Sequence, residues 1–300
     1  MDRAPTPASS ARVPEPAQDG WEGRIARGFR LARVCGEVLS SDRRLLALPL
    51  LAALCSLLAL IAAASLGRRL LGGSDAVGVI APAWFAAYAV SFVTIFFNVA
   101  LVHVIAARWR GEQAGVGRGL AIAARRAVAV AGWAVLTTTV GLALQLLQRL
   151  TLGASRLVFG IVAGGAWSVA SFFVVPVLAL ERRGPLRALR RSTQLVRERR
   201  ADGLAGATPI ALAMATVLLP ILALALIGAV LFAMDVTLPG LTAMGVALAA
   251  GVALWVVSVA LSQVFALAVY QHATGAPCHE DFAAADLERP REGRLLGRRR

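Results

Sequence analysis

The sequence predicts an all-α fold, a polytopic bundle of six membrane-spanning helices with amphipathic helices on the cytoplasmic surface. Hydrophobic residues make up 58% of the 300-residue chain, above the level of about 45–50% that is typical of soluble domains. These residues gather in six long apolar runs, while the basic residues, all of them arginine, gather in alternate connections. The runs occupy most of the chain, so we expect one membrane domain.

Each apolar run is long enough to cross a membrane, which takes about 20 mostly apolar residues. Pro176 and Pro220 fall inside the fourth and fifth runs, where a proline removes a helix hydrogen bond, so we expect these helices to bend. The predicted spans are residues 45–66, 77–107, 127–148, 154–180, 204–233 and 240–271.

The arginines predict the orientation. The connections after spans one, three and five carry four of the 31 basic residues, Arg68, Arg69, Arg149 and Arg156, and the other 27 lie in the remaining connections and tails. Because cytoplasmic loops collect arginine, we expect a multi-pass protein of the bacterial inner (plasma) membrane with both termini in the cytoplasm. Residues 1–20 and 276–300 are expected to be flexible cytoplasmic tails, with the membrane domain at 21–275.

Three basic stretches, residues 21–40, 115–126 and 185–200, show helical periodicity ahead of the odd-numbered spans. In the clearest, residues 185–200, Leu186, Leu189, Thr193 and Val196 share one arc of the helix. A helix of this kind lies in the membrane interface. The spacing of about eighty residues suggests three parallel repeats of helix, span and span, although any polytopic protein alternates charged inner loops with bare outer ones. The opposite arc provides the candidate contacts for anionic lipid or a partner: Arg187, Arg190, Arg191 and Arg197.

Glu181 follows span four and precedes this arginine-rich helix. We expect it to pair with Arg187 or another basic residue and to attach the helix to the span. Within span four, Gly160, Gly164 and Gly165 include a GxxxG step, which is typical of close helix packing.

Few residues offer chemistry. The span centres carry no charge, which argues against an ion-coupled pump, and the familiar catalytic signatures are missing from the sequence. The histidines and Cys35, Cys55 and Cys278 are scattered, so we expect neither a metal site, a cofactor nor a disulfide framework. The arginines flank membrane spans, so nucleic acid is not an expected partner.

Several short motifs resemble an uncharacterised family of bacterial and archaeal membrane proteins, itself distantly similar to the membrane domain of some glycerophosphodiester phosphodiesterases. The resemblance covers residues 21 to 287 and implies a six-span helical domain of unknown activity, without catalytic residues. The motifs are Gly28-Phe29-Arg30-Leu31, Pro49, Phe96-Phe97-Asn98, Gly111, Ala166-Trp167-Ser168, Phe172 to Pro176, Glu181, Gly184-Pro185, Ala188-Leu189, Arg191-Ser192, Tyr270, Pro277 and Phe282.

The leading functional hypothesis is a non-enzymatic membrane protein that contacts anionic lipids or a protein partner through its basic helices, with a homo-oligomer as an open alternative. A transporter or channel for an apolar or uncharged solute, gated at Pro176 and Pro220, is the second hypothesis. A membrane subunit of a separately encoded lipid-headgroup enzyme is the third, and it rests on the family resemblance alone.

Overall fold

The computed structural model describes residues 33, 35–37, 43–70, 76–151, 154–198 and 207–276, and all regular elements in these ranges are helices. The tails, Cys278 and most of the expected helix at 21–40 lie outside the described residues. In chain order the helices are α2 (Arg43–Leu70), α3 (Ala76–Trp109), α4 (Val116–Arg125), α5 (Ala127–Leu150), α6 (Ala154–Ser171), α7 (Val174–Leu180), α8 (Pro185–Glu198), α9 (Ala207–Ala233) and α10 (Thr237–Thr274).

By length and composition, five helical segments of the described chain are long and apolar enough to cross a membrane. The N-terminal helix α2, which is 28 residues long, contains a shorter apolar segment, Ala47–Ala63. The described part of the chain is therefore all-helical with five candidate spans, and the sixth span stays a prediction. The five segments are Ala81–Trp109, Ala127–Leu150, Ser155–Leu180, Met214–Ala233 and Thr237–Thr274.

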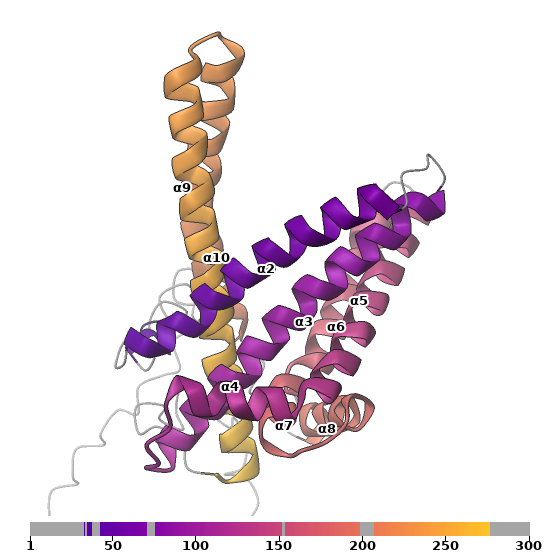
Figure 1. Ribbon diagram of the computed structural model, residues 1–300, viewed down its shortest axis with the longest axis vertical. Helices are drawn as coiled ribbons and strands as arrows, with labels where there is room; N and C mark the ends of the chain where they lie inside the picture. Colours follow the sequence, from indigo (N-terminus) through magenta and orange to yellow (C-terminus); the bar gives the residue numbers. More distant parts are fainter. Residues whose placement is uncertain are drawn as a thin grey trace, which may run out of the picture.

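The helices form two arms that diverge from a shared base (Figure 1). The first arm contains α2, α3, α5 and α6, and the second is the antiparallel hairpin of α9 and α10. The base consists of α4, α7, α8 and the C-terminal parts of α3 and α10. Since α10 packs against α2, α3 and α7, it joins the second arm to the first.

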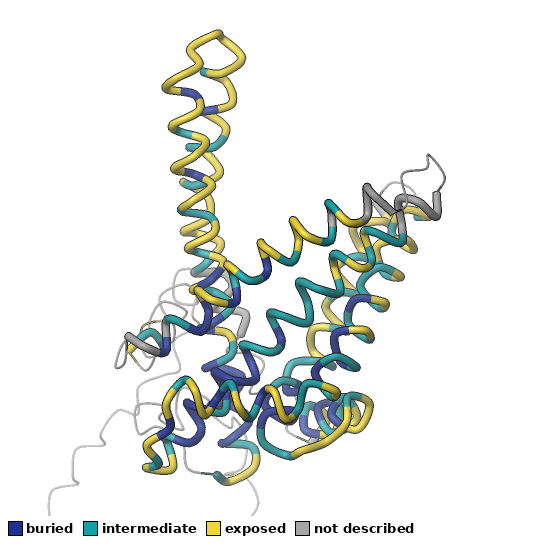
Figure 2. The backbone as a smooth tube through the Cα atoms, in the orientation of Figure 1, coloured by how far each residue is buried: buried dark blue, intermediate teal, exposed yellow. Residues whose placement is uncertain are grey.

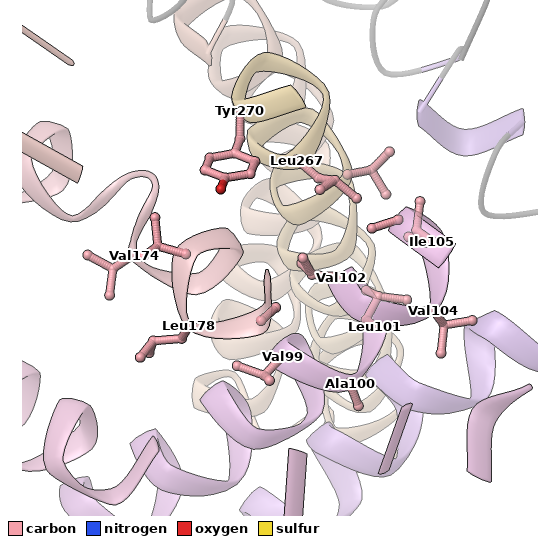
Figure 3. Close-up of a cluster of buried hydrophobic side chains, with 14 of the residues drawn as sticks. Val99, Ala100, Leu101, Val102, Val104, Ile105, Val174, Leu178, Leu267 and Tyr270 are labelled. Atoms are coloured by element: carbon pink, nitrogen blue, oxygen red, sulfur yellow. The ribbon is translucent and has the colours of Figure 1, made fainter. Parts of the chain in front are cut away.

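Burial is concentrated in the base, whereas the outer part of the hairpin of α9 and α10 is largely exposed and much of the first arm is of intermediate burial (Figure 2). Apolar side chains of α3, α7 and α10 interlock there, and the arms present leucine, valine and isoleucine outward, as expected of helices whose solvent is lipid. Figure 3 labels members of this core: Val99, Ala100, Leu101, Val102, Val104, Ile105, Val174, Leu178, Leu267 and Tyr270.

The fourth predicted span is interrupted between α6 and α7, at Phe172 and Phe173. Pro176 explains the position, because a proline cannot donate to the carbonyl four residues earlier, here that of Phe172, and its ring crowds that carbonyl. Ser192 of α8 bridges the gap: its hydroxyl donates to the carbonyl of Ala170 at 2.7 Å and accepts from the amide of Phe173 at 3.1 Å. By contrast, Pro220 lies within the uninterrupted helix α9.

The helices α4 and α8 lie at two of the three stretches expected to be interfacial, but both rest on other helices of the chain. In α8 the buried face consists of Ala188, Ser192 and Leu195, an arc that the two-faced pattern of residues 185–200 did not single out. Leu186, placed on the apolar arc by the sequence, is 61% exposed. This part of the prediction was wrong, because small and polar residues allow the closest packing against α6 and α7.

The two helices of the second arm approach closely at two glycines. A β-carbon at Gly228 would lie 2.9 Å from the backbone nitrogen of Met244, and one at Gly240 would lie 2.7 Å from the nitrogen of Phe232. Both distances are too short for real side-chain carbons, so glycine is needed for this contact. The expected threefold repeat stays a prediction.

Candidate functional site

The arginines selected from the sequence lie on the outer surface of α8. Arg187, Arg190 and Arg197 are exposed. Arg191 is turned toward the protein, where its Nε lies 3.5 Å from Oε1 of Glu181. The four predicted contact residues therefore divide into three exposed arginines and one arginine paired with Glu181.

Glu181, at the C-terminal end of α7, contacts side chains of α8, of α10 and of the turn between α7 and α8. Its Oε2 lies 2.6 Å from Nε of Arg183, and its Oε1 accepts a hydrogen bond of 2.7 Å from the hydroxyl of Tyr270. With Arg191, these contacts attach the end of the second arm to the base. The pairing expected for Glu181 is thus made with Arg183 and Arg191 rather than with Arg187.

Next to Glu181 lies a pocket of about 580 Å³ at the surface of the base. Four arginines line it: Arg125 and Arg126 come from the junction of α4 and α5, and Arg182 and Arg183 from the turn between α7 and α8. We call it the arginine pocket. Its described lining includes no acidic residue, and the remaining lining residues are Ile122, Val128, Ala129, Gly184 and Pro185.

Arg126 is the most enclosed of these charges, and its Nη1 donates to the backbone carbonyl of Leu178. Burial and the neighbouring positive charge of Arg182 lower the pKa of Arg126, although an arginine in this position remains protonated. Arg182 has a φ of 51°, in the left-handed region that is uncommon for residues other than glycine. The chain turns abruptly after α7, and this turn places Arg182 and Arg183 in the same pocket as Arg126.

Two helices also begin beside the arginine pocket. Helix α5 begins beside it with Arg126 in the N-cap position and no side-chain cap, and α8 begins at Pro185 with no acidic residue in its first turn. The first amides of a helix carry partial positive charge and attract anions. The pocket therefore combines four guanidinium groups with two helix ends, and its chemistry is that of an anion site.

One wall of the pocket is apolar and open. Val128 is 88% exposed, and Val135, which is seven residues later and on the same side of α5, is 41% exposed. Because this face continues from the pocket along a candidate span, a molecule with an anionic head and an apolar tail matches it better than a free anion.

None of the pocket arginines was among the predicted contact residues. The sequence signal that could have found them is a pair of Arg-Arg doublets, each at the end of a predicted helix. Helical periodicity favoured α8 as the contact surface because its charges repeat at helical spacing. The two doublets, by contrast, form one site only because α5 packs against α8.

The glycines of span four differ in their surroundings. A β-carbon at Gly160 would lie 2.3 Å from Nε2 of Gln148, so α5 and α6 meet there. Gly164 and Gly165 would meet no atom within 4 Å. At these two positions the described residues make no close contact of this kind, and the expected packing role stays a prediction.

Polar groups within the spans join neighbouring helices. The hydroxyls of Thr138 and Ser91 lie 3.2 Å apart, and those of Ser56 and Thr94 lie 3.3 Å apart, which links α5 to α3 and α3 to α2. No group of three potential metal ligands occurs among the described residues. Cys35 and Cys55 are free thiols.

A second, apolar pocket of about 430 Å³ lies between α9, α10 and the break after α6. Phe172 and Phe265 form its inner wall, and Trp255 and Leu218 line it farther along the second arm. Ser258 and Ser262 contribute hydroxyl groups. The cavity has the composition expected for an apolar ligand or lipid chain.

A protein family of unknown function, DUF6159, matches residues 77–279. The match covers about two thirds of the chain and includes all the arginines of the pocket, Glu181 and Tyr270. No curated protein and no solved structure matches the chain, and the expected similarity to glycerophosphodiester phosphodiesterases finds no support. This multi-helix membrane protein belongs to the DUF6159 family, whose function is unknown.

Proposed function

We propose that the protein is a non-enzymatic, six-span protein of the inner membrane that binds anionic lipid headgroups in the arginine pocket. The observation that carries the proposal is the convergence of four arginines on a pocket whose described lining holds no acid. Only Arg183 has a described carboxylate partner, Glu181. An anion would offset the charge that remains.

The distribution of charge supports an orientation with the base in the cytoplasm. Arg149 and Arg156 lie at the ends of α5 and α6 that are remote from the base, whereas the arginines of α4 and α8 lie within it. Cytoplasmic ends of spans collect arginine. In this orientation α2 serves as the sixth span, and the pocket opens at the depth of the inner-leaflet headgroups.

The exposed arginines of α8 have a supporting role in this proposal. Arg187, Arg190 and Arg197 attract an anionic surface by about 1 kcal/mol each near the membrane, without selecting one lipid molecule. The arginine pocket encloses its ligand and has an apolar side at Val128. In this proposal it therefore selects one class of lipid over another.

The test measures quenching of tryptophan fluorescence by brominated phosphatidylglycerol, titrated into vesicles of phosphatidylcholine that contain the purified protein. Trp133 lies two turns along α5 from Arg126 and is buried, and it stacks on the half-buried Trp167, so quenching of Trp167 is read after the exposed Trp255 has been replaced by phenylalanine. Unmodified protein should prefer brominated phosphatidylglycerol over brominated phosphatidylcholine.

Replacing Arg125, Arg126 and Arg182 together by glutamine should remove most of this preference. At about 1 kcal/mol per arginine the loss is on the order of 100-fold in relative affinity. The matched control replaces Arg149 and Arg156, at the opposite membrane surface, and should leave the preference unchanged. Equal quenching by the two lipids, or an equal effect of the two sets of substitutions, would refute the proposal.

A second function, binding or transport of an apolar solute, is favoured by the apolar pocket beside Phe172 and Trp255. The pocket lies beside the break before Pro176, and its lining includes Leu218, two residues before Pro220. Replacing Ser258 by phenylalanine would fill this pocket. If the function is correct, this change should abolish saturable binding of an apolar fluorescent probe, whereas Val246→Phe on an exposed face of α10 should not.

A further inference from the structure

We infer that the arginine pocket recognises a lipid headgroup with two phosphate groups rather than one. This inference rests on the proposed function and narrows it to a class of ligand. Arg125 and Arg126 approach from the α4–α5 junction, and Arg182 approaches from the α7–α8 turn.

The charge count is the first argument. Arg183 is paired with Glu181 at 2.6 Å, and Glu181 also serves Arg191. Arg125, Arg126 and Arg182 have no carboxylate partner among the described residues. A single phosphodiester carries one negative charge and would leave two of these three arginines uncompensated. Two phosphates offset most of the charge.

The geometry of the pocket is the second argument. The two pairs of arginines belong to separate elements, and each pair lies beside its own helix N-terminus, that of α5 or that of α8. One phosphate contacts one such cluster of donors well, because its oxygens accept from neighbouring guanidinium and amide groups. A pocket of about 580 Å³ accommodates a second phosphate at the other cluster.

The apolar wall identifies the source of the phosphates as a lipid. Val128, at the rim, is 88% exposed and begins the membrane-spanning part of α5. Basic pockets between helices at a cytoplasmic membrane surface take multiply charged lipid headgroups. A soluble diphosphate would leave this wall unused.

The experiment compares vesicles that have equal headgroup charge. One set contains cardiolipin in phosphatidylcholine, and the other contains phosphatidylglycerol at twice the molar fraction, so that general attraction to the surface is the same. Competition for a brominated lipid at the tryptophans reports occupancy. We expect cardiolipin to compete about tenfold better per lipid molecule than phosphatidylglycerol, as an additional charge-assisted contact predicts.

Single substitutions separate the two halves of the pocket. Arg125→Gln and Arg182→Gln should each reduce the preference for cardiolipin to near unity while phosphatidylglycerol is still favoured over phosphatidylcholine. The control Arg187→Gln, on the exposed side of α8, should weaken both anionic lipids equally. Circular dichroism and thermal unfolding in detergent identify variants that fail to fold. Arg125→Gln tests the half of the pocket at the α4–α5 junction, and Arg182→Gln tests the half at the α7–α8 turn.

The outcomes distinguish this inference from the proposed function. Equal competition by cardiolipin and phosphatidylglycerol, with both better than phosphatidylcholine, overturns the inference and leaves the proposed function intact. No preference for either anionic lipid overturns both. Displacement of lipid by inorganic pyrophosphate, but not by sulfate at equal ionic strength, assigns the site to a soluble diphosphate and overturns the choice of a lipid.

Discussion

Replacing Ser192 by alanine should destabilise the base strongly, although it removes a single oxygen atom. Ser192 is fully buried, and its hydroxyl serves the carbonyl of Ala170 and the amide of Phe173. In an unbroken helix these groups would pair with Val174 and Val169, but the break between α6 and α7 removes both partners. Alanine would leave both buried groups unsatisfied.

The expected cost follows from these two groups. A buried polar backbone group left without a partner costs about 1–3 kcal/mol, so the lower limits together give a loss of about 2 kcal/mol in the free energy of unfolding. The assay is reversible unfolding by sodium dodecyl sulfate in mixed micelles, followed by tryptophan fluorescence. Thr193→Ala is the matched control, because its hydroxyl bonds to the carbonyl of Arg190 within the same helix.

The control should change the free energy of unfolding by less than about 0.5 kcal/mol, as most surface substitutions do. If Ser192→Ala stays within the same limit, the serine does not hold the break together and the reasoning is refuted. If both variants are equally destabilised, the effect belongs to α8 as a whole.

Three further predictions concern other contacts. Tyr270→Phe removes the 2.7 Å hydrogen bond to Glu181 and should cost about 1–2 kcal/mol in the same unfolding assay; an unchanged midpoint would contradict a role in joining α10 to α7. Gly228→Ala should cost about 1–3 kcal/mol through overpacking between α9 and α10, whereas Gly245→Ala, with no atom within 4 Å, should have little effect. Burial raises the pKa of the Cys35 thiol to about 12, so a variant that retains it as the sole cysteine should resist maleimide at pH 8 until the protein is unfolded, and rapid labelling of the native protein would show that the thiol is accessible.

Hydrophobic runs predicted the helices well because the signal is local. For example, α5 was expected at residues 127–148 and extends from Ala127 to Leu150. A bend was expected at Pro176, and the structure has a full interruption of the helix just before it, at Phe172 and Phe173. Pro220 lies in the continuous helix α9, since membrane helices tolerate proline when neighbouring groups compensate, and the bend expected there stays a prediction.

The functional site was less predictable because contacts between distant segments create it. Arg125 and Arg182 are separated by an entire helical hairpin, and nothing in the sequence states that their two doublets meet. Periodicity instead selected Arg187 and Arg190, whose side chains are exposed. An amphipathic pattern shows which residues share a face of a helix, but it does not show what that face contacts.

Local sequence patterns and tertiary packing determine different features of this protein. By itself, the sequence determined that the chain is helical and apolar and that its arginines gather beside alternate helix ends, because hydrophobicity and charge act over one or two helical turns. The tertiary structure decided that the buried face of α8 centres on Ser192, that Gly228 provides close packing, and that four arginines form one pocket. These outcomes depend on the three-dimensional packing of helices far apart in the chain, which local patterns do not encode.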